Sequence, residues 1–482
     1  PVLWIADIRS YPRDKKNPWI QDNNMTLEHK VKKTEENKLK EEACKLSIKE
    51  GSAYSVMDGF GLRYITPYIL ALGGSTTQVG LLTSVPLLLG SIAELPAIKA
   101  IRHHSRKTLV FWGVLIQALL WLAIIGVGAL FFIFNIDHSF APNTLIVLFS
   151  ILMISGLAMH PVWTSWMRDI VPKNYNNYFG IRNKVLGIVA IISMLIAGTI
   201  LDFFRPINIY WGFAIIFFIA FIGRAISARY FLKKYEPRLV IKHNHELHFL
   251  RFVEKLTESN FGRYALFTSL ISLAVAIASP FFAVYMLEDL QLNYLQFTMV
   301  SLSSLIIMFL TMPWWGKFAD KYGNYTTMRI TGFLIPIVPL IWLATPLVNN
   351  INPSYVVPYL IIIEAYSGLV WAGYNLSIAD FVYDSASPET MAPFMAFTTI
   401  LSNFGIFIGA VIGGWIASTD IVFLGLPAIL VAFLISGILR YIVAFIYLPK
   451  IKEIKHVKKF NMSAAKMQFF HLHFNKLARL IR

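Results

Sequence analysis

The chain has 482 residues, of which 56% are hydrophobic and only 15% are charged, and its formal net charge is +16. Soluble globular proteins carry about a quarter charged residues, so this composition excludes that class and indicates a membrane protein. The positive charge does not indicate nucleic-acid binding, because it is concentrated in one set of loops and tails between apolar stretches.

The first fifty residues are polar and rich in Lys and Glu. They contain no apolar core of a cleavable signal peptide, so we expect the first apolar stretch to act as the membrane signal. We expect residues 1–53 to form a cytoplasmic tail that is helical over about 26–50. Cys44 is the single cysteine, so an intrachain disulfide is excluded.

The first apolar stretch, Tyr54–Gly74, carries two charged residues, Asp58 and Arg63. Each costs roughly 2.5–3.5 kcal/mol near the centre of a membrane helix. On a regular helix they are about 140° apart, which makes them poor partners for one another. We therefore expect each to find a partner elsewhere, with Glu364 close in depth to Arg63 and Glu94 close to Asp58.

Twelve apolar stretches are long enough to span a bilayer. They lie near 54–73, 76–98, 108–134, 142–165, 181–201, 207–231, 263–287, 294–315, 328–348, 355–380, 391–416 and 421–448. They predict a six-helix bundle over 54–231, a cytoplasmic linker over 232–262, a second bundle over 263–448 and a basic, amphipathic cytoplasmic tail over 449–482. Within the linker, HFLRFVEKL has helical spacing and predicts a short interfacial helix.

The Lys and Arg residues are distributed unevenly between the two sides of these spans. Of the 43, 39 lie in or next to the loops on the side of the termini, one (Arg205) lies on the other side, and Arg63, Arg224 and Arg440 lie within spans. Basic loops stay on the cytoplasmic side of a cell membrane, so we expect both termini to be cytoplasmic. We expect Arg224 and Arg440 to be structural or to reach the membrane surface.

The two bundles repeat one another. Pro313 matches Pro96 at an offset of 217 in the numbering, and Arg440 matches Arg224 at an offset of 216. Matches at a near-constant offset across six spans predict a tandem duplication. Since six is even, the two copies run in the same direction, and parallel six-span halves enclose a cavity at the middle of the membrane.

Span 8 ends in WGKFADKYGNYTTMR, which contains the pattern G-x-x-x-D-[RK]-x-G at Gly316, Asp320, Lys321 and Gly323. This pattern resembles the signature loop of the major facilitator superfamily, which is also built from two six-span halves. The resemblance implies an all-α membrane fold with twelve transmembrane helices in two parallel six-helix repeats. It also implies that the loop acts as a cytoplasmic latch.

The chemistry of the motif suits this role. We expect Gly316 to let a neighbouring helix approach closely and Asp320 to face the N-terminus of span 11, where Ser387 is the expected N-cap. In the first half, Lys99, His103 and Arg106 occupy the positions of Gly316, Asp320 and Gly323. We therefore expect a latch in the second half only.

Ionisable residues inside spans mark a substrate path or proton relay unless they form a structural network. We assign Asp58 and Glu94 to proton coupling. We assign Arg63, Glu364, Trp371 and Asn375 to substrate binding, with Arg63 as substrate or counter-ion residue and a structural ion pair as the alternative. Two further residues, Tyr374 and Asn403, are expected to complete the cavity.

We expect a transporter of a small organic solute that works by alternating access, is coupled to protons, and sits as a monomer in the cell (inner) membrane. The alternatives are a lipid flippase or scramblase, and an uncoupled facilitator on the same fold. The chain has no Walker loop, GxSxG or HExxH motif, so we expect no enzyme activity, no cofactor, no metal and no nucleic-acid partner. The expected partners are the solute or lipid substrate, protons and membrane lipids.

Overall fold

The architecture was analysed in a computed structural model. It describes residues 27–134, 140–171, 175–237, 249–254, 256–385, 391–454 and 457, and the regular structure within these ranges is helical. The expected C-terminal tail beyond residue 457 lies outside the described residues.

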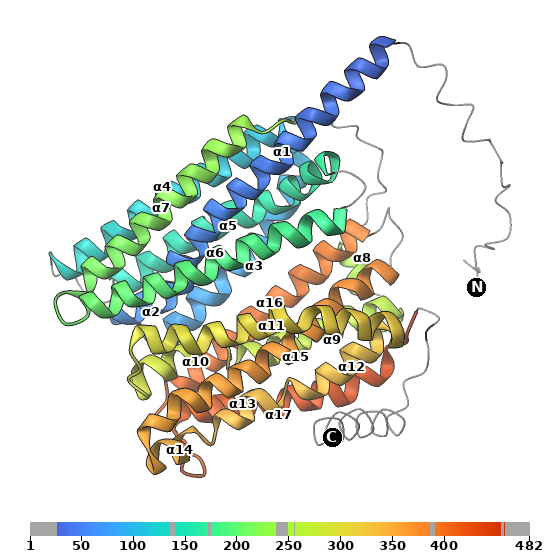
Figure 1. Cartoon of the computed structure of the whole chain (residues 1–482). Coiled ribbons are helices and arrows are strands. Elements are labelled where there is room, and N and C mark those ends of the chain that lie inside the picture. The colour runs from blue at the N-terminus through green and yellow to red at the C-terminus, as the bar shows by residue number, and fades with distance from the viewer. Residues whose placement is uncertain are drawn as a thin grey trace, which may run out of the picture.

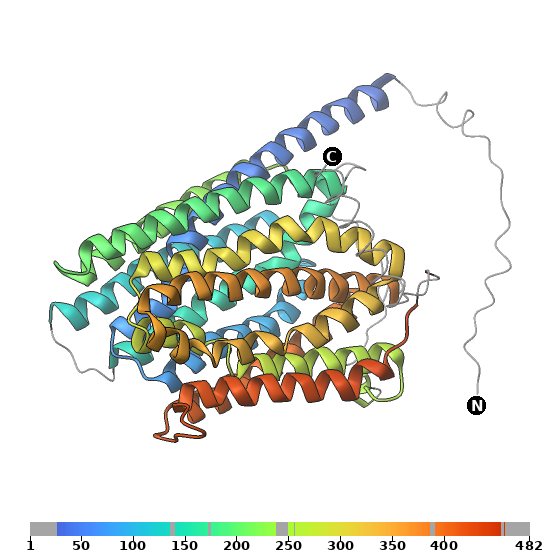
Figure 2. The ribbon, with the colours of Figure 1, turned by 60° about the horizontal axis from the view of Figure 1, so that its bottom comes forward.

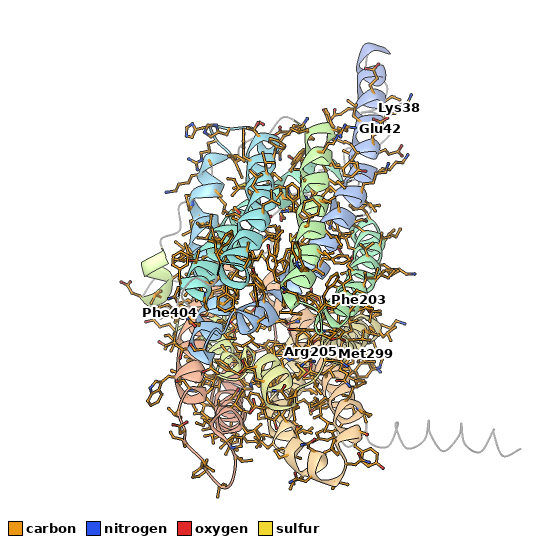
Figure 3. The ribbon with its side chains drawn as sticks, turned by 90° about the vertical axis from the view of Figure 1, so that its left-hand side faces the viewer. Lys38, Glu42, Phe203, Arg205, Met299 and Phe404 are labelled. Carbon is orange, nitrogen blue, oxygen red and sulfur yellow. The ribbon has the colours of Figure 1, made fainter. Side chains whose placement is uncertain are left out.

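The first half contains seven helices and one 3-10 turn. These are α1 (Leu27–Phe60), η1 (Leu62–Tyr64), α2 (Ile65–Ala71), α3 (Thr76–Ala100), α4 (Arg106–Phe132), α5 (Phe140–Ile170), α6 (Tyr175–Phe204) and α7 (Ile209–Lys233). Helix α1 runs without a break from the polar tail into the first span. Figures 1 and 3 show its first part, with Lys38 and Glu42, extending beyond the bundle.

The linker contains α8 (Phe249–Glu254), which confirms the predicted short helix. The second half then repeats the pattern with more interruptions. Its elements are α9 (Asn260–Ala276), α10 (Phe281–Val284), the π-turn η2 (Tyr285–Asp289), α11 (Tyr294–Tyr322), α12 (Asn324–Leu334), α13 (Ile337–Trp342), α14 (Thr345–Ile351), η3 (Pro353–Tyr355), α15 (Val356–Ser385), α16 (Met391–Ala417), α17 (Ala428–Tyr447) and η4 (Leu448–Lys450).

Eleven segments within the described ranges are long and apolar enough to span a membrane. The twelfth is the first span, which is divided into the end of α1, η1 and α2. The two halves lie one above the other in Figure 1. The described structure therefore agrees with the predicted twelve-helix fold.

The first span of each half breaks at the same place in the repeat. In the first half the break follows Gly61, whose Cβ would lie 2.5 Å from the Trp121 ring if it were any other residue. In the second half α9 ends at Ala276, just before Pro280, which cannot donate a backbone hydrogen bond. At the offset of 217 Gly61 corresponds to Ala278, so the two breaks are repeat-related.

The second helix of each half begins with a repeated capping box. Ser75 and Gln78 cap α3 through each other's backbone amides, and Asn293 and Gln296 do the same for α11. The two boxes are related by an offset of 218 in the numbering, so the duplication preserved the start signal along with the apolar helix.

The two halves are joined at the end of the bundle that carries α2 and α10, here called the distal end. There the carboxylate of Asp202, in the last turn of α6, accepts hydrogen bonds from the backbone amides of Tyr294 and Leu295 at the start of α11, both at 2.8 Å. The Arg205 guanidinium of the first half lies 6.0 Å from the ring centroid of Tyr294 in the second, and Figure 3, viewed from this end, labels Arg205.

Helices α3 and α16 pack against each other across the same boundary. The Thr77 hydroxyl donates to the Gly414 carbonyl at 3.4 Å, and a Cβ at Gly80 would lie 2.7 Å from the Ala410 carbonyl oxygen. Small residues therefore allow the two helices to approach closely at the distal end.

Candidate functional site between the two halves

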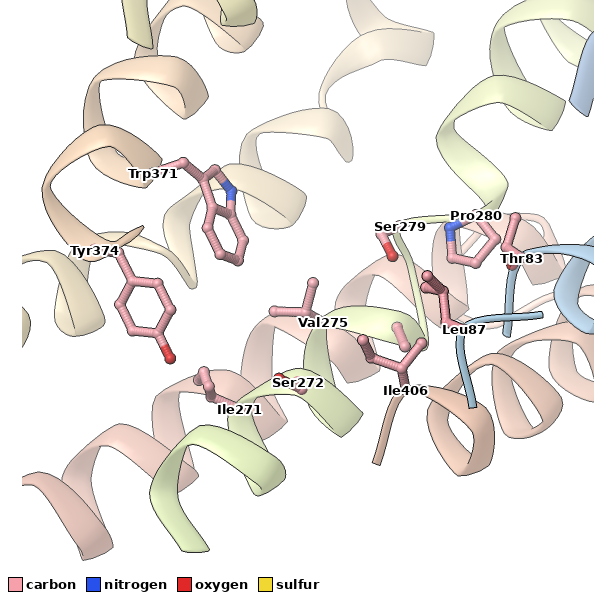
Figure 4. Close-up of a pocket in the computed structure, with 11 residues that line it drawn as sticks. Thr83, Leu87, Ile271, Ser272, Val275, Ser279, Pro280, Trp371, Tyr374 and Ile406 are labelled. Carbon is pink, nitrogen blue, oxygen red and sulfur yellow. The ribbon is translucent and has the colours of Figure 1, made fainter. Parts of the chain in front are cut away.

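A pocket of about 330 Å³ lies between the halves, beside the break after α9. Its walls come from α3 of the first half and from α9, α15 and α16 of the second (Figure 4). Aromatic and aliphatic side chains form most of the lining, with hydroxyl groups between them. These residues are Thr83, Leu87, Ile271, Ser272, Val275, Ala276, Ser279, Pro280, Trp371, Tyr374 and Ile406.

Two predicted cavity residues, Trp371 and Tyr374, line this pocket from one face of α15. Their rings meet edge to face with centroids 5.4 Å apart, and Figure 4 shows both on the same side of the pocket. Tyr374 is buried and Trp371 is half-buried. The pair therefore forms an aromatic wall on which a flat, uncharged group can pack.

The first half contributes Thr83 and Leu87. The Asn403 side chain on α16 donates to the Leu87 carbonyl at 3.2 Å and so crosses the boundary beside the pocket. None of the pocket-lining side chains is charged.

The expected arrangement of Asp58 and Arg63 is wrong. The Arg63 guanidinium donates to the Asp58 carboxylate, with both Nε and Nη2 at 3.3 Å. The expected separation around a regular α-helix does not apply, because η1 follows Gly61 and turns Arg63 back towards Asp58. The Arg63 side chain is 45% exposed and that of Asp58 is 17% exposed.

Glu364 is not the partner of Arg63. It lies within the second half, with its carboxyl beside the side chains of Ser304 and Trp342. The depth argument failed here because similar depth does not bring two helices together. Glu94 on α3 is half-buried, and no ion pair or hydrogen bond of its side chain is found among the described residues. It lies two helical turns beyond Leu87, on the same face of α3.

Asn375 is exposed and is absent from the pocket lining. It lies one helical turn beyond Trp371 on the same face of α15, at the spacing that brings side chains into contact. Its assignment to the substrate site stays a prediction.

The loop motif is arranged differently from the expectation at one position. A Cβ at Gly316 would meet only Leu376, at an ordinary 3.8 Å, so no close helix approach requires this glycine. The close approaches between α11 and α15 occur at Gly368 and Gly373, where a Cβ would lie within 2.5 Å of Ser304 and Trp315. Asp320 and Lys321 are exposed, and the expected N-cap at residue 387 lies outside the described residues.

Gly323, by contrast, has a structural requirement. Its φ is +93°, and its Cβ would lie 2.0 Å from the Glu453 carboxylate. The same carboxylate accepts a hydrogen bond from the Tyr325 amide at 2.9 Å, at the start of α12. An anion therefore does stabilise a helix N-terminus in this loop, but it is Glu453 that caps α12.

Glu236 performs the same task in the first half. It accepts a hydrogen bond from the Arg106 amide at 2.7 Å, at the start of α4, and it matches Glu453 at the offset of 217. The Arg106 side chain is 1% exposed and forms an ion pair with Asp169 at 2.6 Å. The sequence analysis missed both glutamates, although the constant offset would have identified them.

A second buried cluster joins α1 to the rest of the first half. Glu50 is 3% exposed and accepts hydrogen bonds from Trp163 at 3.2 Å and Arg182 at 3.4 Å. The Lys234 ammonium is fully buried 3.6 Å from the same carboxylate and 5.2 Å from the Trp166 ring. In the sequence, Ala43, Ser47 and Glu50 are spaced along one face of the helix expected in the polar tail, and this spacing could have indicated that the face is buried.

The two repeat-related arginines within spans are structural, as expected, and both are buried. Arg224 donates to Gln117 through two guanidinium nitrogens. Arg440 donates to the carbonyls of Val275 and Ile335, which become available where α9 and α12 end. Neither reaches the membrane surface, because each bonds to groups inside its own bundle.

Comparison with known proteins agrees with this architecture. The family model of the Major Facilitator Superfamily matches residues 51–410 and also 264–473. No curated protein sequence matches the chain significantly.

Solved structures with similar folds include transporters. The nucleoside transporter NupG has a TM-score of 0.62 at 14% identity, over 86% of this chain and 99% of its own. The POT family transporter PepTSo has a TM-score of 0.63 at 11% identity, over 84% and 97%. An inward-facing, unoccupied bacterial homologue of the human lysosomal transporter Spinster has a TM-score of 0.57 at 15% identity, over 87% and 99%. From the family match, the repeated halves and the shared fold, this chain belongs to the major facilitator superfamily and is a multi-pass membrane transporter.

Proposed function

We propose that the chain is a proton-coupled secondary transporter that moves a small, uncharged organic solute by alternating access. The observation that carries this proposal is the pocket at the break after α9, which is lined by both halves. A site shared by two parallel bundles and bordered by a discontinuous helix is exposed to one side or the other when the bundles rock.

The closed distal end supports the same mechanism. Backbone amides of α11 donate hydrogen bonds to Asp202, the Thr77 hydroxyl donates to the Gly414 carbonyl, and these bonds hold the halves together there. With both termini in the cytoplasm, the distal end faces outwards, and this conformation is closed on the outside. Transport then requires these contacts to break while contacts form at the opposite end.

The lining supports an uncharged substrate with a flat or apolar part. Trp371 and Tyr374 offer aromatic surface, and the hydroxyls of Ser272, Ser279 and Thr83 offer hydrogen-bonding groups. Nucleosides combine a planar ring with hydroxyl groups, so they are the first probes to test, followed by sugars, amino acids, organic acids and lipids.

The Asp58–Arg63 pair supports coupling. Protonation of Asp58 removes the anion that holds Arg63, so a proton binding at this pair changes the packing of the broken first span. We assign Glu94 of α3 as the second proton-binding group, because its carboxyl has no partner among the described residues. Arg63 is the counter-ion in this mechanism.

The substrate site is tested by thermal stability and uptake in proteoliposomes. A ligand that binds only the native state raises the melting temperature. We expect at least one soluble probe to stabilise the wild-type protein and the Trp314→Ala variant, whose tryptophan is 55% exposed on α11, but not Trp371→Ala. Stabilisation by lipids alone would instead support the flippase alternative.

Coupling is tested with the same substrate in vesicles carrying a pH gradient. We expect Asp58→Asn/Glu94→Gln to lose gradient-driven accumulation while retaining exchange without a gradient. Asp420→Asn, at an exposed distal carboxylate, is the matched control. Full accumulation by the double variant would contradict the assignment of these two carboxylates.

A further inference from the structure

A second pocket, of about 440 Å³, lies far from the substrate pocket, between the start of α9 and the end of α17. Figure 2 shows these two helices side by side, and they pack against each other in the described structure. The lining residues that matter here are Thr257, Arg263, Leu266, Tyr447, Lys450 and Lys452.

This pocket is strongly basic. Arg263, Lys450 and Lys452 all line it, and no carboxylate does. Within the described ranges none of these three cations forms an ion pair, although six other ion pairs are present. Three cations facing one cavity without an anion repel one another, and a bound anion would relieve that repulsion.

The arginine is held in place for such a contact. Arg263 Nε donates to the Thr257 carbonyl at 3.1 Å and Nη1 donates to the Lys450 carbonyl at 3.3 Å. These two bonds fix the plane of the guanidinium, and Nη2 has no hydrogen-bond partner among the described residues. The Lys450 ammonium lies 5.0 Å from the Tyr447 ring centroid, which positions it beside the pocket. A guanidinium with two ammonium groups suits a phosphate group.

The pocket also continues into an apolar outer surface. Residues at helical spacing on α17 are exposed before it reaches the pocket: Tyr441 by 53%, Ile442 by 45%, Phe445 by 66% and Ile446 by 44%. In a transporter such a face is in contact with acyl chains. Because α17 ends at Tyr447, the basic pocket lies where the apolar span gives way to the polar headgroup region.

We propose that this pocket binds the phosphate of an anionic phospholipid headgroup, while the acyl chains lie along the exposed face of α17. Arg263, Lys450 and Lys452 contact the phosphate. Basic pockets at the ends of membrane helices recognise anionic lipids through this combination of charge and adjacent apolar surface.

The duplication provides a matched control. Lys233 matches Lys450 at the offset of 217 and is exposed at the equivalent end of α7, and Arg229 is exposed one turn earlier. Neither residue lines the basic pocket. A variant of these two residues removes the same charge from the equivalent end of the first half.

The test uses the full chain, purified in an uncharged detergent and titrated with dioctanoyl phosphatidylglycerol, dioctanoyl phosphatidylcholine or sodium phosphate. The melting temperature is the readout. We expect phosphatidylglycerol to stabilise the wild-type protein at concentrations where the other two do not. We expect Lys450→Gln/Lys452→Gln to weaken this response at least about tenfold and Arg229→Gln/Lys233→Gln to leave it unchanged.

Three results would overturn the proposal. Equal stabilisation by phosphatidylcholine would show that charge is not recognised. An equal loss in both double variants would show general attraction to a basic surface, and an equal response to sodium phosphate would assign the pocket to a soluble anion. Both lysines are exposed, so their variants should fold, which the melting temperature without lipid checks directly. The outcome is independent of the substrate pocket and of coupling.

Discussion

At the scale of single residues, buried charges fix the loops of the first half. Arg106 is 1% exposed and contacts the carboxylate of Asp169 at 2.6 Å and the Pro237 carbonyl at 2.7 Å. Its charge is compensated inside the protein. Removing the guanidinium takes the counter-charge from two partly buried carboxylates, those of Asp169 and Glu236, and leaves the buried Pro237 carbonyl without its donor.

We predict that Arg106→Ala lowers the free energy of unfolding by about 3–5 kcal/mol, because Asp169 and Glu236 both lose their cation. The change is measured as a lower melting temperature in detergent. Arg102→Ala, at an exposed position in the same loop, should change stability by no more than about 0.5 kcal/mol. Equal effects of the two substitutions would show that the buried contacts contribute nothing specific.

Lys234 gives the stability of the first half a dependence on pH. Burial lowers the pKa of Lys234 to about 8, against 10.5 for an ordinary lysine, and the nearby Glu50 opposes this shift. Below pH 8 the folded and unfolded states both hold the proton, so the burial penalty is fully present. Between pH 8 and 10.5 only the unfolded state holds it, so this residue's contribution to stability rises with pH.

We therefore predict that the melting temperature of the wild-type protein, relative to Lys234→Met, rises between pH 7.5 and 10. The comparison removes the pH effects that the two proteins share. Lys233→Met, at the exposed neighbouring lysine, should give a constant difference from the wild type over the same range. A constant difference in melting temperature between the wild-type protein and Lys234→Met over this range would mean that Lys234 keeps an ordinary pKa.

At the scale of helices, the two glycines of the loop motif differ in their structural requirements. Gly316 lies within α11, and Gly323 lies at the turn between α11 and α12. Gly323 combines a φ of +93° with a Cβ position 2.0 Å from Glu453, whereas Gly316 has an ordinary neighbour at 3.8 Å. We predict that Gly323→Ala destabilises the protein by about 1–3 kcal/mol and that Gly316→Ala has little effect on the melting temperature. Comparable melting temperatures for the two variants would contradict this distinction.

The helices were predictable from sequence because length and hydropathy decide them, and the short linker helix followed from its spacing. The breaks within the first span of each half could not be predicted from the sequence. Helix α1 ends just before Gly61, where the Trp121 ring of α4 occupies the space that a Cβ would need, and this contact between helices far apart in the sequence has no local signal. The pairing of Asp58 with Arg63 depends on that break, so a regular-helix estimate could not find it.

The same limit applies to the pocket. Trp371 and Tyr374 were found because aromatic residues at helical spacing in a late span stand out. Thr83 and Leu87 have no distinguishing feature in the sequence, and they line the pocket only because α3 crosses to the second half. Which helices meet is a property of packing, and apolar periodicity does not specify it.

At the scale of the whole molecule, the duplication preserved the scaffold and let the two copies diverge at their ends. Glu236 and Glu453, related by the offset of 217, cap equivalent helices. Arg106 and Gly323 share the same offset but have opposite properties, a buried cation in one half and a positive-φ turn in the other. The halves are thus similar in architecture and unequal in how their loops are fixed.

In the proposed mechanism, the contact between the halves at the distal end controls access to the pocket. Asp202 accepts hydrogen bonds from the first two backbone amides of α11, while Asn293 accepts from the third. Asp202→Ala removes a charged cap from a helix of the other half, which costs the distal contact about 1–2 kcal/mol. The substitution leaves each bundle's own core intact, so the loss should appear as a shift between conformations.

We predict that this shift raises the population of the distally open state roughly 5–30-fold. It is measured as the labelling rate of a pocket cysteine, Ser279→Cys in a Cys44→Ser background, by an impermeant maleimide added outside intact cells. Asp420→Ala, at an exposed distal aspartate, should leave the rate unchanged. If Asp202→Ala also left it unchanged, the distal contact would not be what limits access to the pocket, and the contacts of Thr77 and Gly414 would have to carry that role alone.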